Sequence, residues 1–173
     1  MAQSYSSNVE YSAYQKLRER PFCRNGRIHR RLASLAEVER GHANVLEQLL
    51  RDPARWLLWI NFDIAHDLKR ERGQGRRLSF VLLEDRHSII AECSSNKNMA
   101  RERHFDAASE SLLSGLGWRP ATGWETTNWN YEADYEHRHR LSTLLSATAR
   151  RVCKVASRDL VEVGMQPCNI DHA

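Results

Sequence analysis

Hydrophobic side chains recur at helical spacing in three segments of the chain. From residue 33 to 51 they recur close to the helical period, and Pro53 soon afterwards blocks continuation of a helix. Between 105 and 116 the apolar positions again share one face, and Gly117 follows as a candidate left-handed cap. The longest stripe, from about 135 to 155, predicts the last helix.

Shorter apolar runs, rich in β-branched and aromatic residues, lie between these helices. The run 56–62 is too short to cross a membrane and predicts a buried strand. Residues 78–83 and 89–93 flank a polar tip, which is typical of a hairpin. A further strand is expected at 127–131, and LVEVGM near the C-terminus is expected to be a short strand or coil.

The expected order is therefore helix, three strands, helix, one or two strands, helix. Strands joined by short turns pair antiparallel and leave one face for helices to cover, so we expect an α+β fold with an antiparallel sheet packed against helices. A chain of 173 residues suits one domain, which we place at 32–165. A basic, partly flexible N-terminal arm (1–31), with at best one short helix and a loop, precedes it, and a tail (166–173) follows.

Charge is distributed unevenly, although the formal net charge is only +4. Residues 15–31 carry seven Lys or Arg against one acid, and residues 69–77 carry five against one. Residues 106–136 instead hold six acids and one base, Arg119. The protein is therefore expected to have a basic end and an acidic face.

Nucleic-acid binding is the alternative function that the basic clusters support, because Lys and Arg neutralise phosphates. No helix-turn-helix, RNA-recognition or zinc module can be placed around them, and charged runs are commonly solvated surface. The clusters would also suit an acidic protein partner. The arginines chosen for either contact are Arg24, Arg27, Arg30, Arg31, Arg76 and Arg77.

No group of residues with a recognisable catalytic pattern stands out. His66-Asp67 is similar to the metal-binding dipeptide of phosphohydrolases but lacks partner ligands on helices. His137 and His139 are two positions apart and would point to different sides of a helix. The acidic pair at 84–85 lies at a hairpin tip, where nothing would desolvate it. We expect no enzymatic activity, no metal and no cofactor.

The cysteines and the N-terminus bear on where the protein works. Cys23, Cys93, Cys153 and Cys168 include no CxxC pair, so free thiols in a reducing compartment are expected. The first residues lack a basic start followed by an apolar stretch, so no secretory signal is expected. We place the protein in the cytoplasm, without membrane contact.

Residues from about 80 to 160 resemble the actinobacterial TY-Chap proteins, a family grouped with YbjN-type proteins and type III secretion chaperones. The shared features are a hairpin followed by a Ser-Asn pair, a helix closing in Leu-Gly-Trp with a proline after it, a later Asn-Trp, and a long helix. They correspond here to Ala91-Glu92, Ser95-Asn96, Leu116-Gly117-Trp118, Pro120, Asn128-Trp129 and the stripe from Leu141 to Val155. The basic N-terminal arm has no counterpart in the family.

The resemblance implies a secretion-chaperone-like fold and a non-enzymatic, chaperone-like or adaptor protein. Such a protein binds a peptide or protein partner and often works as a dimer, so a homodimer is left open. An exposed sheet face or edge can accept an extended segment through main-chain hydrogen bonds.

Three of the five tryptophans lie between residues 115 and 130, among three glycines and a proline. Trp118 follows the expected helix cap and is predicted to fill the core. Trp129 alternates with polar neighbours and is predicted to face the covered side of the sheet. Trp124 lies in the loop and is the first choice for partner contact. The candidate partner-binding set comprises Trp124, Trp118 and Trp129.

Overall fold

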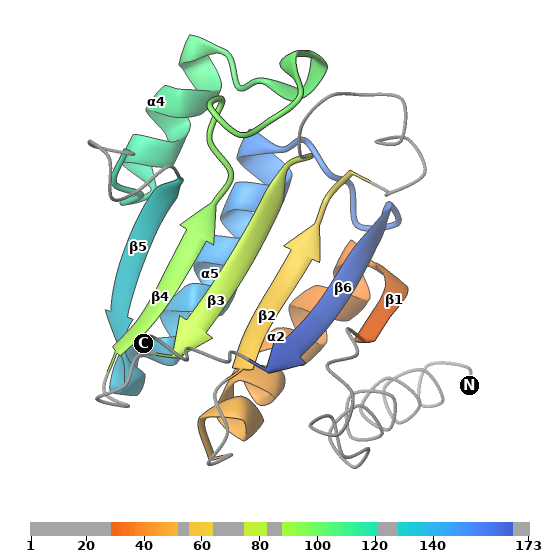
Figure 1. Ribbon diagram of the computed structural model, residues 1–173, viewed down its shortest axis with the longest axis vertical. Coiled ribbons are helices and arrows are strands. Elements are labelled where there is room, and N and C mark those ends of the chain that lie inside the picture. The colour runs from red at the N-terminus through yellow and green to blue at the C-terminus, as the bar shows by residue number, and fades with distance from the viewer. Residues whose placement is uncertain (1–28, 52–55, 64–74, 83–87, 121–127, 168–173) are drawn as a thin grey trace, which may run out of the picture.

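A computed structural model describes residues 29–51, 56–63, 75–82, 88–120 and 128–167 (Figure 1). Within them, a six-stranded antiparallel sheet carries helices α2 and α5 on one face, behind the sheet in Figure 1. The α+β prediction is confirmed. The elements are β1 (His29–Ser34), α2 (Leu35–Arg51), β2 (Trp56–Asn61), β3 (Arg77–Leu82), β4 (Ser88–Cys93), η2 (Arg101–Arg103), α4 (Ala107–Gly115), β5 (Trp129–Asp134), η3 (Tyr135–His137), α5 (Arg138–Ala147), η4 (Thr148–Val152) and β6 (Leu160–Pro167).

The strand order is β1-β6-β2-β3-β4-β5, so β1 and β5 are the two edge strands. The hairpin predicted from the sequence is present as β3 and β4, with Leu78 opposite Cys93 and Phe80 opposite Ala91. The last strand, β6, lies between β1 and β2 and pairs antiparallel with both.

Both ends of the chain depart from the predicted order. β1 begins at His29, within residues expected to form a short helix and a loop, and pairs with β6 along its whole length. β6 confirms the strand that was one of two possibilities for LVEVGM, although the expected element order had placed the optional extra strand before the last helix. The local pattern does not reveal either pairing, because β1 and β6 lie near opposite ends of the chain. The proposed domain boundaries stay predictions.

The start of α2 is set by a capping box, two residues after the predicted start. The Glu37 carboxylate accepts a hydrogen bond from the Ser34 amide at 2.5 Å, and the Ser34 hydroxyl accepts one from the Glu37 amide at 3.3 Å. Near the same end of α2, the Arg150 guanidinium donates to both carboxylate oxygens of Glu39, at 2.7 and 2.6 Å. This pair joins α2 to η4.

The core lies between the sheet and the helices. Burial alternates along β4, where every second residue points to the helices. Buried residues of the neighbouring strands and of α5 complete this layer, among them Leu58, Ile60, Leu78, Phe80, Ile89, Leu141, Leu144 and Leu145. On the opposite face, the Trp59 ring lies so close over Gly164 of β6 that a Cβ at Gly164 would overlap it.

The end of α4 has the predicted left-handed cap. Gly117 has a φ of +94°, and its amide donates to the Ser114 carbonyl at 3.0 Å while the Trp118 amide donates to that of Leu113 at 3.1 Å. These two bonds form a Schellman motif, in which glycine is favoured at the positive φ. The chain therefore turns at Gly117, as the sequence predicts.

The predicted helix from 135 to 155 is shorter and less regular in the structure. It begins as η3, continues as α5 and ends in the π-helical turn η4. The wider π turn holds the buried Thr148, whose hydroxyl accepts a hydrogen bond from the Trp118 indole at 3.0 Å. Among the described helices, none is long and apolar enough to cross a membrane.

Candidate functional site

The tryptophans do not form one aromatic surface. Trp118 and Trp129 are 2% and 6% exposed, which confirms the predictions that they belong to the core. Trp118 packs edge-on against Tyr131, with ring centroids 6.1 Å apart. Trp124 lies outside the described residues. The assignment of all three to partner binding stays a prediction, and for Trp118 and Trp129 it would require exposing a side chain that is now buried.

Residues of the motif shared with the TY-Chap proteins hold one corner of the fold together. Asn96 clamps the segment before α4, because its side chain donates to the Phe105 carbonyl at 2.9 Å and accepts from the Phe105 amide at 2.7 Å. Asn98 donates to the Asn128 side chain at 3.0 Å and so ties the same segment to the start of β5. The motif therefore positions α4 and β5.

The arginines proposed for acidic partners are not brought together in the described part of the chain. Arg24 and Arg27 lie outside it, and Arg30 and Arg31 belong to β1, with side chains that are not described. Arg77 is half-buried on β3. Arg76 binds the buried Asp63 carboxylate, with a shortest contact of 2.6 Å, and donates to the Cys153 carbonyl at 2.7 Å.

This ion pair has a clear electrostatic cause. Burial acts to raise the pKa of Asp63, but the hydrogen bonds and charge of Arg76 outweigh it and hold that pKa below its ordinary value. A partner that used Arg76 would have to break this pair. The role of the arginines in binding stays a prediction.

The candidate metal and redox groups offer no catalytic arrangement within the described residues. The rings of His137 and His139 lie 6.4 Å apart, and no cluster of three His, Cys, Asp or Glu side chains could hold a metal there. Cys93 and Cys153 are free, as predicted; both are buried, and burial raises the pKa of the Cys153 thiol to about 12. His66-Asp67, the pair at 84–85 and the other two cysteines lie outside the described residues.

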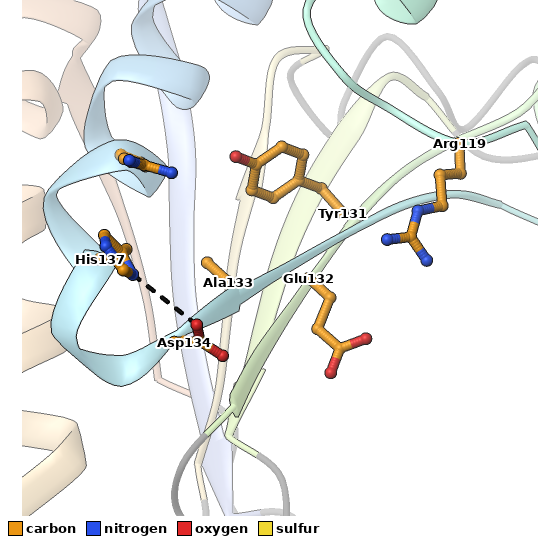
Figure 2. Close-up of a pocket in the computed structure, with 7 residues that line it drawn as sticks. Arg119, Tyr131, Glu132, Ala133, Asp134 and His137 are labelled. Atoms are coloured by element: carbon orange, nitrogen blue, oxygen red, sulfur yellow. Dashed lines mark ion pairs between the residues drawn. The ribbon is translucent and has the colours of Figure 1, made fainter.

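A groove of about 310 Å³ runs along β5, and we call it the β5 groove (Figure 2). Its lining comes from the segment that follows α4, and from β5, η3 and α5, which are consecutive in the chain. The lining residues are Arg119, Tyr131, Glu132, Ala133, Asp134, His137 and Arg140. None of these residues was expected to bind a partner, because Arg119 is distant in sequence from the other six, which lie within 131–140, and no local pattern shows that they line an open sheet edge.

The hydrogen bonds of β5 show which way its backbone points. The Arg119 amide donates to the Asn130 carbonyl at 2.8 Å, and the Asn130 amide donates to the Arg119 carbonyl at 3.0 Å. Arg119 lies outside the sheet, so these groups of Asn130 point away from β4. Backbone direction alternates along an antiparallel strand, so the N–H and C=O groups of Glu132 and Asp134 also point to the outer edge.

The side chains of β5 alternate between two sides of the strand. Trp129 and Ala133 are buried toward the helices, and Tyr131 packs partly against the same core. Asn130, Glu132 and Asp134 therefore face the opposite side. Figure 2 shows Tyr131 and Glu132 on opposite sides of the strand, with Arg119 on the side of Glu132.

The polar groups of the groove are accessible to water. Arg119, Glu132 and Arg140 are exposed. His137 Nδ1 lies 3.7 Å from the Asp134 carboxylate and forms an ion pair with it when the imidazole is protonated. The arrangement offers hydrogen-bonding groups of both charges beside an open strand edge, which suits binding of an extended chain.

Fold and site together define an α+β protein with an accessible sheet edge, a class in which extended segments can bind by strand addition. Within this class, residues 27–165 match TY-Chap3, the family described as T3SS (YopN, CesT) and YbjN peptide-binding chaperone 3. The match covers more than half of the chain, which therefore belongs to this family. No curated protein and no solved structure matches the chain.

The family match confirms the resemblance found in the sequence and extends it at the N-terminal end. It begins at residue 27, two residues before β1, so the strand that the sequence pattern did not predict lies inside it. The family implies a peptide-binding, chaperone-type role.

Proposed function

We propose that the protein binds an extended segment of a protein partner along the outer edge of β5, as a chaperone-type or adaptor protein. The observation that carries this proposal is the outward direction of the Glu132 and Asp134 backbone groups beside the β5 groove. A bound segment would add a strand to the sheet through main-chain hydrogen bonds, which do not depend on sequence.

The accessible edge is short, and this limits the mode of binding. Arg119 already pairs with Asn130 at one end, and η3 begins at Tyr135 at the other. Main-chain pairing is therefore confined to Glu132 and its neighbours, so contacts with side chains in the β5 groove must supply much of the affinity. Trp124 remains our proposed aromatic contact, because in the sequence it lies between Pro120 and Asn128, which flank the Arg119–Asn130 bridge.

The proposal also concerns catalysis, cellular location and oligomeric state. Membership of a chaperone family supports action without catalysis, and we propose that it takes place in the cytoplasm. A homodimer joined through β5 would occupy the edge that the partner needs. Nucleic-acid binding through the basic clusters has no supporting observation in the described residues.

A proline at position 132 tests the proposal. Glu132→Pro removes one outward amide and leaves the bonds between β4 and β5 in place, because proline is tolerated on an edge strand where its missing N–H faces outward. Glu132→Ala is the matched control, since it removes the same side chain and keeps the amide. Peptides selected from a random library on the wild-type protein should bind Glu132→Pro at least about tenfold more weakly than Glu132→Ala, because the two variants differ in the amide and share the loss of the carboxylate.

Fluorescence anisotropy measures the affinities, and circular dichroism checks that both variants are folded. Amide hydrogen exchange supplies a readout that needs no substitution: the Glu132 amide should exchange more slowly when peptide is bound. Wild-type affinity in a folded Glu132→Pro protein, or unchanged exchange at Glu132, would refute binding at this edge.

A further inference from the structure

We propose that the segment bound at β5 carries alternating charge, with acidic side chains toward α5 and basic side chains toward the opposite side of the sheet. This inference rests on the proposed binding at the β5 edge and specifies the chemistry of the partner. It follows from the way in which the charged groups around β5 are divided between its two sides, with the Asp134–His137 contact at the boundary between them.

The side toward α5 is predominantly basic. α5 begins at Arg138, and Arg140 lines the β5 groove together with His137 of η3. Arg140 and His137 are the basic groups that line the groove on this side, and the Asp134 carboxylate lies 3.7 Å from the His137 ring. Tyr131 lies on this side as well. A bound side chain that points toward α5 therefore meets mainly cations and hydrogen-bond donors.

The opposite side, which we call the open side, is predominantly acidic. Glu132 is exposed there, and Asp134 is exposed at the end of the strand, where its carboxylate also lies 3.7 Å from His137. Glu92 of β4 is the direct partner of Asn130, and directly paired residues point to the same side of a sheet, so Glu92 lies on the open side too. Arg119 is the counter-charge and lies opposite Asn130, at one end of the accessible edge. Glu132 and Glu92, with Asp134 at the end of the strand, thus outnumber the one guanidinium of Arg119.

A strand added to β5 would contact the charged groups on both sides, because its side chains point alternately to the two sides of the sheet. The residue directly opposite Glu132 would point to the open side, where a lysine or arginine is favoured. Its two neighbours would point toward α5, where glutamate or aspartate is favoured. The edge therefore selects an acid–base–acid triplet centred opposite Glu132, flanked by residues that form strands.

Three peptides with the same flanks test this inference. Their sequences are TVEKEKVT, with alternating charge, TVEEKKVT, with the same composition in blocks, and TVEEEEVT, with acidic residues only. In low salt, the alternating peptide should bind the wild-type protein at least about fivefold more tightly than the block peptide, because opposite charges across strands attract. The difference should shrink in high salt, which screens exposed charges.

Reversing the open side should reverse the preference. Glu132→Lys with Asp134→Lys makes both sides basic, so this variant should bind the acidic peptide more tightly than the alternating one. Glu102→Lys on η2 is the matched control, since it adds a positive charge at an exposed residue outside the groove. Like the wild-type protein, it should bind the alternating peptide more tightly than the acidic one.

The outcomes separate this inference from the function on which it rests. Charge selection would be overturned if the wild-type protein bound the alternating and block peptides equally in low salt. It would also be overturned if the variant with Glu132→Lys and Asp134→Lys still bound the alternating peptide more tightly than the acidic one. In that case, loss of peptide binding in Glu132→Pro would still support peptide binding at the β5 edge. If neither the three peptides nor a random library yielded a ligand for the wild-type protein, both proposals would be overturned.

Discussion

His42 is a fully enclosed imidazole between the two helices and the sheet. Its Nδ1 lies 2.9 Å from the Ser142 hydroxyl of α5, and its ring centroid lies 4.5 Å from that of Phe80 on β3. Burial lowers the pKa of His42 from 6.5 to about 3, because a charged imidazole would lose its hydration there. The side chain therefore acts as an uncharged part of the core at neutral pH.

We predict that His42 makes the fold sensitive to mild acid. Because its pKa is lower in the folded state, the unfolded state binds more protons below about pH 6.5, and stability falls progressively toward pH 3. Between pH 7.5 and 5.0 this amounts to about 2 kcal/mol. His42→Phe should remove most of the loss, whereas the exposed His139→Gln should retain it.

Urea denaturation at the two pH values measures this effect. The quantity of interest is the change in the free energy of unfolding between them, so a general destabilisation by the phenylalanine does not affect the conclusion. An identical acid sensitivity in wild type and His42→Phe would show that His42 is not its source.

At the scale of single elements, the end of α4 offers a matched pair of glycines. An alanine at Gly117 would be strained at a φ of +94°, and its Cβ would lie 3.2 Å from Cε2 of Tyr131. Gly115 lies in the last turn of α4, where an added Cβ meets nothing within 4 Å. We predict that Gly117→Ala destabilises the protein by about 1–2 kcal/mol, whereas Gly115→Ala is neutral or stabilising by up to about 1 kcal/mol.

Chemical denaturation of the two alanine variants checks this prediction. Equal effects of the two substitutions would argue against the Schellman motif at the end of α4. Tyr131 lines the β5 groove, so the Gly117 variant should also bind peptide less well if the added methyl group shifts this ring.

The elements that depend on neighbouring residues could be predicted from the sequence. The hairpin needs only two apolar runs and a polar tip, and the cap needs only a glycine after the helical stripe. β1 could not be predicted, because HRRLAS has few apolar residues and becomes a strand through its pairing with β6. The irregular end of the last helix depends in the same way on a distant contact, between Thr148 and Trp118.

At the scale of the whole molecule, the Asp63–Arg76 pair links distant parts of the chain. Asp63 follows β2, Arg76 precedes β3, and Arg76 also bonds to the carbonyl of Cys153 after η4. A second cation, Arg103 of η2, lies 3.6 Å from the same carboxylate. Two loops and the end of the last helix therefore meet at one buried negative charge.

We predict that Asp63→Asn destabilises the protein by about 2–3 kcal/mol, because it leaves the partly buried arginines without their counter-charge. Thermal denaturation measures the loss, and the exposed Glu102→Gln is the control for removing a carboxylate. The depressed pKa of Asp63 adds a second expectation: its contribution is complete above the ordinary range of an aspartate and is lost as the pH falls below it. A wild-type melting temperature in Asp63→Asn would contradict the structural role of this pair.

The sequence by itself determined the fold class, the hairpin, the left-handed cap and the core position of Trp118, because each depends on periodicity or on adjacent residues. It also contained the motif that places the chain in its family. Only the tertiary structure decided that β5 is an edge strand. The next strand along the chain, β6, pairs with β1 and β2 and not with β5, so β5 has β4 as its one neighbour in the sheet. The β5 groove could not be predicted from the sequence either. Arg119, Glu132 and Arg140 line one groove only because β5 and α5 pack beside the segment that follows α4.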